Sequence, residues 1–345
     1  MGLGDKETHS KLIIDSYKRL VEKECDLTKF DEVRILGSYG RGEPTSTSDL
    51  DVWFILTSQN NKPLDVSAVL SNKDLKIRRQ LIKQYKLRST FIDNRATILT
   101  GEEAKLYNKA FPVRLGIPYD RGEQRTIIGN PNTTTYSCEE VKTDLAVSIN
   151  EFIENWETAI INKAGLKKEK KWLYILCRDL LFFRDGIQVS LHKDLDKIFA
   201  NYYRGNFNLL VKEGRDFYRE LVQNIPAKNM SLRKLSHSLM WTYEKVEWEL
   251  IESFGDIDYF NNWRFGKYRL YGFFPFELEM LIEKVTNILG SGNLKDTDVF
   301  VEELVELRQL NYDLKNLPHT YKIFQNWVLS ALRLSLENEK NSYAK

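Results

Sequence analysis

The sequence predicts an α+β protein in which a small mixed β-sheet flanked by helices, in residues 1–135, is followed by an all-helical bundle in residues 136–345. Two short apolar runs, near 33–37 and 49–57, have the length and composition typical of buried strands. Helical periodicity surrounds these runs and is almost the only pattern in the second part of the chain. A chain of 345 residues is also long for one hydrophobic core, which favours two domains.

The elements of the first domain follow from the spacing of its apolar residues. Residues 7–23 predict an amphipathic helix, and residues 68–86 predict a second helix with a strongly basic surface. A further strand is expected at 87–93, with 96–99 as its extension. Proline and glycine break the pattern between 111 and 135, which indicates a connecting segment.

The second domain begins at a capping box, in which Ser137 caps a helix and Glu140 reaches back to it. Apolar residues then recur at helical spacing to the end of the chain. The clearest helices are expected at 168–184, 229–253, 276–289, 297–315 and 319–337. We expect the functional site in the cleft between the two domains, where ligand sites often lie.

Composition and charge narrow the classes of function. With 42% hydrophobic and 29% charged residues the chain has an ordinary soluble composition, and no apolar run is long enough to span a bilayer. A net charge of +2 gives no general basic field of the kind that nucleic-acid binders carry. Cys25, Cys138 and Cys177 are far apart and lack metal-ligand spacing, which indicates reduced thiols. We therefore expect a cytoplasmic protein with no membrane partner.

The segment from residue 33 to 56 is the most informative part of the chain. Asp49 and Asp51 are two positions apart on a predicted strand, so their side chains should leave the same face. Two such carboxylates raise each other's pKa unless a cation lies between them. Hard oxygen ligands of this kind suit Mg²⁺, which binds one or two carboxylates together with substrate phosphates. The pair therefore predicts phosphoryl or nucleotidyl transfer.

The turn before these aspartates fits the same chemistry. Gly37 ends the first strand where a side chain would crowd a ligand, and Ser38 offers a hydroxyl and a backbone N–H. A helix that begins near Tyr39 would direct further N–H groups and its dipole at a phosphate. An Asp-x-Asp at a strand start is often only a solvated edge, and a Gly-Ser turn alone is common. Both together, between two apolar strands, favour a functional site.

Three short stretches of this segment form an ordered motif: Gly37-Ser38, Arg41-Gly42 and Ser48-Asp49-Leu50-Asp51. The motif covers under a tenth of the chain and resembles the signature of the DNA polymerase β-like nucleotidyltransferase superfamily. The nearest likeness is to bacterial antibiotic (aminoglycoside-type) adenylyltransferases and minimal nucleotidyltransferases. The resemblance implies two Mg²⁺ ions, for which Mn²⁺ can substitute, and a nucleoside triphosphate, ATP being the expected one. The nucleotide-binding residues that it implies are Gly37, Ser38, Arg41 and Ser48.

A third carboxylate is expected, because two metal ions need more ligands than one aspartate pair supplies. Asp93 is the candidate, since it shares one face of the predicted strand with Ser89 and Phe91. In the superfamily the third acidic residue lies on such a neighbouring strand. Asp93 is otherwise a plain strand-ending residue, and Asp65 is a weaker substitute. The expected metal ligands are thus Asp49, Asp51 and Asp93.

In the second domain a helix within 171–186 is apolar nearly all round, yet it carries Arg178 and Asp179. Neither has an opposite charge at a distance of three or four residues, so we expect partners from elsewhere. One interpretation is an ion pair with another helix; the other is that Asp179 orients or deprotonates an acceptor hydroxyl. The stretch from Leu176 to Lys193 resembles the helical domain of streptomycin/spectinomycin adenylyltransferases, which implies that Lys193 lies near the triphosphate.

Taken with the resemblance, these residues predict a metal-dependent transferase that moves AMP from ATP to a hydroxyl of a small molecule, such as an aminoglycoside-type antibiotic, and releases pyrophosphate. Residues 136–345 would then bind the acceptor, and the protein would serve antibiotic resistance. The alternative acceptor is a macromolecule, a tRNA end or a protein hydroxyl, as in toxin–antitoxin systems. The basic helix and the aromatic-basic stretch 259–276 favour a nucleic acid, whereas the near-neutral charge does not. A regulatory module that only binds nucleotides would not need both Asp49 and Asp51.

Overall fold

The computed structural model describes residues 3–46, 48–57, 62–92, 95–120, 122–131, 133–162, 166–187, 192–254, 273–289 and 317–343. Within these residues the chain combines one small mixed sheet with many helices, so the predicted α+β class is confirmed. None of the helices in the described ranges is long and apolar enough to cross a membrane.

The chain forms two compact units. Residues 1–135 and 235–338 make the first, and residues 136–234 and 339–345 make the second. The sequence places a boundary at the same point, after residue 135, but treats 136–345 as one continuous helical domain. Hydrogen bonds inside the first unit explain the difference, because Tyr243 and Gln325 both donate to Glu103, next to the sheet.

The sheet of the first unit contains β1 (Phe30–Ile35), β2 (Val52–Leu56), β3 (Thr97–Thr100) and β4 (Arg125–Gly129), in the order β3-β2-β1-β4. The pair β2–β3 is parallel and the other two pairs are antiparallel, so the sheet is mixed as expected.

Two expectations for this sheet were wrong. The strand predicted at 87–93 is replaced by a 3-10 helix, η2 (Ser89–Ile92), and pairing begins only at Thr97. The predicted connecting segment contains β4, which pairs with β1. Apolar composition identified a buried segment in the first case but could not separate a strand from a short helix.

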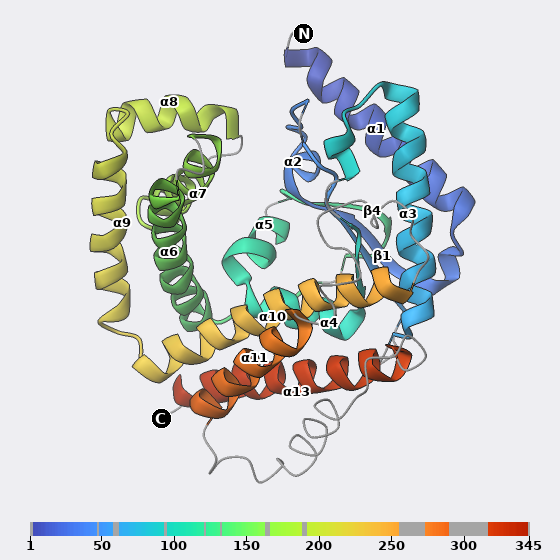
Figure 1. The fold of residues 1–345 in the computed structure, drawn as a ribbon. Coiled ribbons are helices and arrows are strands. Elements are labelled where there is room, and N and C mark those ends of the chain that lie inside the picture. The colour runs from blue at the N-terminus through green and yellow to red at the C-terminus, as the bar shows by residue number, and fades with distance from the viewer. Residues whose placement is uncertain are drawn as a thin grey trace. The chain divides into compact units, whose positions relative to one another are not determined.

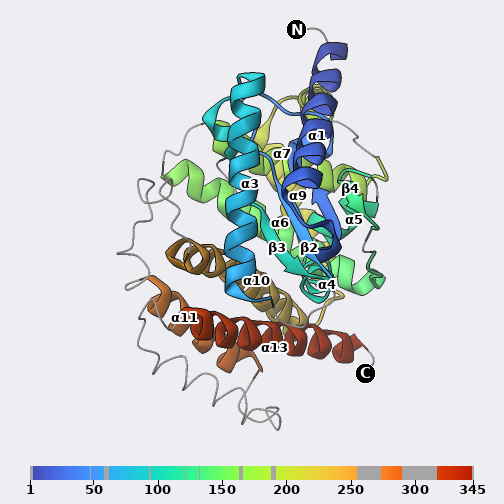
Figure 2. The same cartoon turned by 90° about the vertical axis from the view of Figure 1, so that its right-hand side faces the viewer.

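One face of the sheet is apolar and lies under α1 (Leu3–Glu24) and α3 (Leu64–Tyr85), which run side by side in both views of the fold (Figures 1 and 2). Alternate residues of the strands point toward these helices, as the period of two requires. The buried cluster includes Val33, Ile35, Val52, Phe54, Leu56 and Ile98 from the strands. Both helices were expected from their periodicity, and both are present.

The other face carries polar side chains. Arg34 of β1 forms a two-point ion pair with Glu32, at 2.8 Å for each contact, and its guanidinium lies over the Trp53 ring. The elements near this face include α4 (Gly101–Ala110), residues 235–254 of α10 (Ala227–Phe254) and residues 317–338 of α13 (Leu317–Tyr343). In α10 and α13 the rings of Tyr243 and Phe324 stack at 5.9 Å between centroids, and the two helices lie side by side (Figures 1 and 2).

The remaining described elements of the first unit are short, apart from one helix. They are η1 (Leu27–Lys29), α2 (Gly37–Gly40), the π-helical turn η3 (Pro112–Gly116), α5 (Ile117–Asp120) and α11 (Phe273–Leu289). The helices predicted at 229–253, 276–289 and 319–337 are confirmed. The helix predicted at 297–315 lies outside the described residues.

The second unit contains α6 (Cys138–Ile161), α7 (Leu166–Phe183), α8 (His192–Tyr203) and α9 (Phe207–Val222). The predicted capping box opens α6: the Glu140 N–H donates to the Ser137 hydroxyl at 3.1 Å, and the Ser137 N–H donates to the Glu140 carboxylate at 2.6 Å. α7, predicted at 168–184, is also confirmed.

Candidate nucleotide and metal site

Asp49 and Asp51 were expected on the second strand but precede it: they flank Leu50, and β2 begins at Val52. Leu50 is fully buried in the apolar core, where its N–H donates to the Phe91 carbonyl at 3.3 Å. The Leu50 carbonyl accepts a hydrogen bond of 2.5 Å from the Arg78 guanidinium. Because neighbouring residues of an extended chain point in opposite directions, anchoring Leu50 in the core directs both carboxylates away from it.

Gly37 lies directly against Asp51. Its φ is +62°, a left-handed conformation that glycine adopts without strain, and an added Cβ would lie 2.1 Å from Asp51 Oδ2. The backbone on each side is tied to the second strand as well, because the Leu36 N–H donates to the Asp51 carbonyl at 3.0 Å. The turn and the carboxylate therefore form one rigid unit that no other residue at position 37 would permit.

The helix expected near Tyr39 is only one turn long, α2, from Gly37 to Gly40. A single turn sums few peptide dipoles, so it provides little of the predicted attraction for a phosphate. Ser38 is partly exposed, and its hydroxyl makes no hydrogen bond within the described residues. That hydroxyl is therefore available to a ligand. Arg41 follows the turn, with its Nε 3.9 Å from a Glu43 carboxylate oxygen.

Ser48 shapes the loop that leads to the aspartates. Its hydroxyl accepts a hydrogen bond of 2.8 Å from the Thr45 N–H and lies 3.1 Å from the Thr45 hydroxyl. The Ser48 N–H donates in turn to the Thr45 carbonyl at 3.1 Å. These bonds give Ser48 a structural role in positioning Asp49. This role is additional to the nucleotide contact that the resemblance implies for Ser48.

Arg125 of β4 holds the same turn from the opposite side and was missed in the sequence. Its Nε donates to the Gly40 carbonyl at 2.9 Å, and Nη2 lies 2.8 Å from where a Cβ of Gly42 would be. The residue falls in the segment that composition marks as a connection, so no local pattern distinguishes it.

Glu244 of α10 is a second residue that the sequence did not reveal. Thr97 donates to its carboxylate at 3.1 Å, and Thr97 is paired in register with Trp53, two residues after Asp51. Side chains at paired and alternate positions share a face, so Glu244 and Asp51 lie on the same side of the sheet. Nothing near Glu244 in the sequence indicates this, because only the fold brings α10 to β3.

The electrostatics of this side also link the two acids. Burial raises the pKa of Glu244 to about 7; the hydrogen bond from Thr97 opposes the rise, whereas the negative charges of Glu247 and Asp51 add to it. On the opposite side of the strand, burial lowers the pKa of Arg78, but the negative charges of nearby groups, Asp51 among them, more than reverse that effect. Burial, with a smaller contribution from Asp49, raises the pKa of Tyr39 to about 12.

The expected metal ligands are present only in part. Asp93 lies outside the described residues, and no group of three or more His, Cys, Asp or Glu among those that are described is arranged to hold a metal ion. Asp49 and Asp51 nevertheless supply the two oxygen donors that Mg²⁺ or Mn²⁺ prefers. A cation beside Asp51 would also offset the repulsion between Asp51 and Glu244. The residues present thus fit a divalent cation that completes its coordination with phosphate oxygens and water.

The two candidates from the second half of the sequence belong to the second unit, whereas the motif belongs to the first. Asp179 is buried, and its Oδ1 accepts hydrogen bonds from Arg178 Nε at 2.9 Å and Nη2 at 2.8 Å. The two charges pair with each other on α7, because adjacent side chains reach each other, which the expected spacing of three or four residues did not include. Lys193 lies in α8, but its side chain is outside the described residues.

Some of the basic side chains predicted to form the surface of α3 instead make contacts inside the protein. Arg78 is buried and forms an ion pair of 2.7 Å with Asp74, while Lys73 donates to the Glu24 carbonyl at 2.7 Å. Most of the aromatic-basic stretch, 259–272, lies outside the described residues.

Comparisons of the chain with protein-family models, with curated proteins and with solved structures find no match. Any function assigned to the chain must therefore follow from its own residues.

Proposed function

We propose that this chain is a metal-dependent nucleotidyltransferase that moves a nucleoside monophosphate, AMP from ATP in the first instance, to a hydroxyl of a small molecule. The observation that carries the proposal is the contact between Gly37 and Asp51, where a left-handed turn is fitted to a carboxylate. A merely structural strand start needs no such fit. Here the turn that carries Ser38 lies directly against Asp51, and Asp49 precedes Asp51 by two residues.

The residues divide the work of binding and charge control. Asp49 and Asp51 hold the divalent cation, and the Ser38 hydroxyl donates to a terminal phosphate of the nucleotide. When bound, Mg²⁺ neutralises charge on the phosphates and orients them for in-line attack. The chain itself contributes positioning and fixed dipoles, since nucleotidyl transfer requires no covalent intermediate with the protein.

Glu244 is the residue that we assign to the acceptor's proton. A general base works best when its pKa is close to the working pH, and the pKa of Glu244 is raised to about 7, chiefly by burial. It lies on the same side of the sheet as Asp51, within electrostatic range. Asp179, the candidate from sequence, is already engaged by Arg178, which makes a structural role the simpler one for it.

A small acceptor is favoured over a macromolecule because the net charge of the chain is only +2, without the basic excess that nucleic-acid binders carry. The clearest basic helix, α3, uses Arg78 and Lys73 for contacts within the protein. An aminoglycoside-type antibiotic remains the acceptor class that the motif implies. A tRNA end or a protein hydroxyl is the alternative, and the same assay distinguishes the three.

The test is transfer of label from each of the four α-³²P-labelled nucleoside triphosphates in the presence of Mg²⁺. Acceptors are an aminoglycoside and lincosamide panel, bulk tRNA, and the protein alone. Label on a small molecule, with pyrophosphate released in equal amount, is the expected result. Label on tRNA or protein would show that the acceptor is a macromolecule and that the proposed nucleotidyl transfer itself is correct. Nucleotide binding with no transfer to any acceptor, and no pyrophosphate above that of an Asp51→Asn variant, would leave only a binding module.

A further inference from the structure

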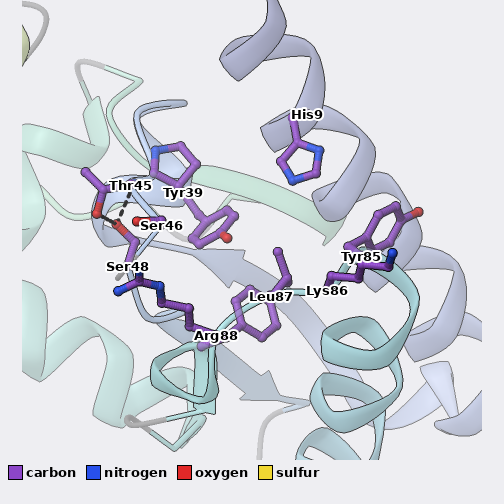
Figure 3. A pocket seen from close by; sticks show the side chains of 11 residues that line it. His9, Tyr39, Thr45, Ser46, Ser48, Tyr85, Lys86, Leu87 and Arg88 are labelled. Carbon is purple, nitrogen blue, oxygen red and sulfur yellow. Dashed lines mark hydrogen bonds between the residues drawn. The ribbon is translucent and has the colours of Figure 1, made fainter. Parts of the chain in front are cut away.

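A cavity of about 520 Å³ lies in the first unit between α1, the loop before Asp49 and the segment that joins α3 to η2 (Figure 3). Its lining includes His9, Tyr39, Ser46, Ser48, Tyr85 and Arg88. Asp49 and Asp51 do not line the cavity, although Asp49 is close enough to Tyr39 to contribute to its raised pKa. Cavities of about 300–1,000 Å³ are typical of small-molecule sites.

Aromatic rings form much of the wall. The Tyr39 and Phe91 rings meet edge to face at 5.5 Å between centroids, and the His9 and Tyr85 rings meet almost at right angles at 6.1 Å. In Figure 3 the His9 and Tyr39 rings face the cavity from different sides. Rings arranged in this way provide π faces and edges for a planar ligand.

The Tyr39 side chain offers its hydroxyl to the cavity. Tyr39 is only 3% exposed, and Figure 3 shows its hydroxyl directed into the cavity. No residue in the described part of the chain bonds to this hydroxyl, whereas the Tyr85 hydroxyl lies 2.6 Å from the Ser16 hydroxyl. Because this hydroxyl opens into the cavity and has no partner in the described part of the chain, it is placed to bond to a ligand.

Two cations stand at the rim. Arg88 and Lys86 are exposed, and neither has a hydrogen-bond or ion-pair partner among the described residues. In Figure 3 the Arg88 guanidinium extends toward Ser48, on the side of the cavity where Ser46 also lies, while Lys86 lies beside Tyr85. This contrasts with Arg78, which is paired inside the protein. A guanidinium beside hydroxyls is suited to a phosphate group.

We propose that this cavity is a second ligand site, which binds a nucleoside monophosphate with its base among Tyr39, His9 and Tyr85 and its phosphate at Arg88. The rings, the Tyr39 hydroxyl and the exposed cations each match one part of such a molecule. Ser48 lines the cavity and directly precedes Asp49, so an occupant would also contact the loop that carries the first carboxylate. An effect of the bound monophosphate on Asp49 through this loop rests on the proposed function, whereas binding of the monophosphate in the cavity does not.

Binding of AMP, GMP, CMP and UMP to the full chain, measured by equilibrium dialysis in EDTA, tests the site without the metal. We expect one equivalent of at least one of the four to bind. Arg88→Ala should weaken that binding at least about tenfold, because a charge-assisted bond to phosphate is lost. Tyr39→Phe keeps the ring and removes only the hydroxyl, so a loss of about threefold to tenfold is expected. Lys83→Ala, an exposed lysine of α3 outside the cavity, is the matched control and should bind as the wild type does.

Three results would overturn the site: no binding of any of the four, equal affinities in the wild type, Arg88→Ala and Tyr39→Phe, or binding that disappears in EDTA. Melting temperatures of both variants close to that of the wild type show that lost binding is not lost folding. An Asp51→Asn variant separates the two proposals, because it should bind the monophosphate normally in EDTA while losing transfer. Normal binding in a chain that shows no transferase activity would defeat the proposed function and leave this site standing.

Discussion

The two faces of the four-stranded sheet differ in what holds them in place. Val52 and Phe54 belong to the apolar face, packed under α1 and α3. Asp51, Trp53 and Thr97 belong to the other face, where Arg34 and Glu32 form a buried ion pair. Burying charges costs free energy unless their partners are well placed, whereas apolar side chains are stabilised by burial alone. The polar face of the sheet therefore carries charged and hydrogen-bonding side chains that packing of the core does not require.

The polar side is held together by a network around Lys62, whose ammonium is fully buried. It lies 2.5 Å from a Glu247 oxygen and 3.5 Å from a Glu103 oxygen, and it donates to the Ile98 carbonyl. The Tyr321 hydroxyl donates to Glu247 at 2.5 Å. Lys62 thus joins β3, α4 and α10, and Tyr321 joins α13 to the same Glu247, so removing the cation leaves two buried carboxylates without a positive charge.

The largest effect should come from Asp51→Asn. Loss of one metal-binding carboxylate is expected to lower transfer by about a thousandfold or more, because charge stabilisation of this kind is worth several kcal/mol. The melting temperature should stay nearly unchanged. Asp31→Asn alters an exposed acid at the other end of the sheet and should leave activity intact. Equal activity in the two variants, measured by pyrophosphate release, would remove the metal assignment.

A pair of stability measurements compares the two faces directly. Lys62→Met leaves two buried carboxylates without their cation and should cost about 3–5 kcal/mol in urea unfolding. Phe54→Ala creates a cavity on the apolar face and should cost a similar amount, about 3–5 kcal/mol. Only the stability lost in Lys62→Met should be recoverable by a second substitution that removes a charge. Adding Glu247→Gln to Lys62→Met should recover part of the loss, because one uncompensated charge disappears. No recovery would show that the network does not act through charge.

Glu244→Gln should change how stability depends on pH. Burial raises the pKa of Glu244 from 4.5 to about 7, so the folded protein holds a proton that the unfolded chain releases. The stability of the wild type should therefore fall relative to the variant as pH rises from about 4.5 to 7, and then stay level. Melting temperatures should agree near pH 4 and favour the variant at pH 8. A constant difference across this range would contradict the raised pKa.

Asp179→Asn should have the smallest effect. The pair with Arg178 spans adjacent residues, and Arg178 is partly exposed, so the loss should be about 1–2 kcal/mol of stability. Nucleotide binding and turnover are expected to remain, as a structural pair implies. If turnover falls sharply while nucleotide binding and the melting temperature persist, Asp179 has the catalytic role that the sequence left open.

The sequence predicts the apolar half of the fold better than the polar half. The periodicity of α1, α3 and β2 depends on neighbours along the chain, so it can be seen in one dimension. The error at η2 arose because Phe91 and Ile92 are buried in a short helix as they would be in a strand. β4 was missed because its apolar side chains are only the adjacent pair Ile127 and Ile128, too short a run to indicate a strand beside the neighbouring glycine and proline.

The candidate site divides in the same way. Gly37, Ser38 and Asp51 lie within one turn and the start of the next strand, and their order could be recognised before the structure. Glu244 and Arg125 reach the site only through the packing of α10 and the pairing of β4 with β1. Contacts of this kind depend on how distant segments meet, and neither residue is marked by its neighbours.

The position of Lys62 gives the protein an intrinsic chemical reporter. Its amine is shielded by the Glu103 and Glu247 carboxylates and by the Tyr243 ring, 5.4 Å from the ammonium. Because the Lys62 side chain is fully buried, an acylating reagent should reach this amine only when the packing around it opens, whereas exposed lysines should react at once. The rate at which Lys62 is acylated, followed by peptide mass spectrometry, thus measures how often the polar face opens.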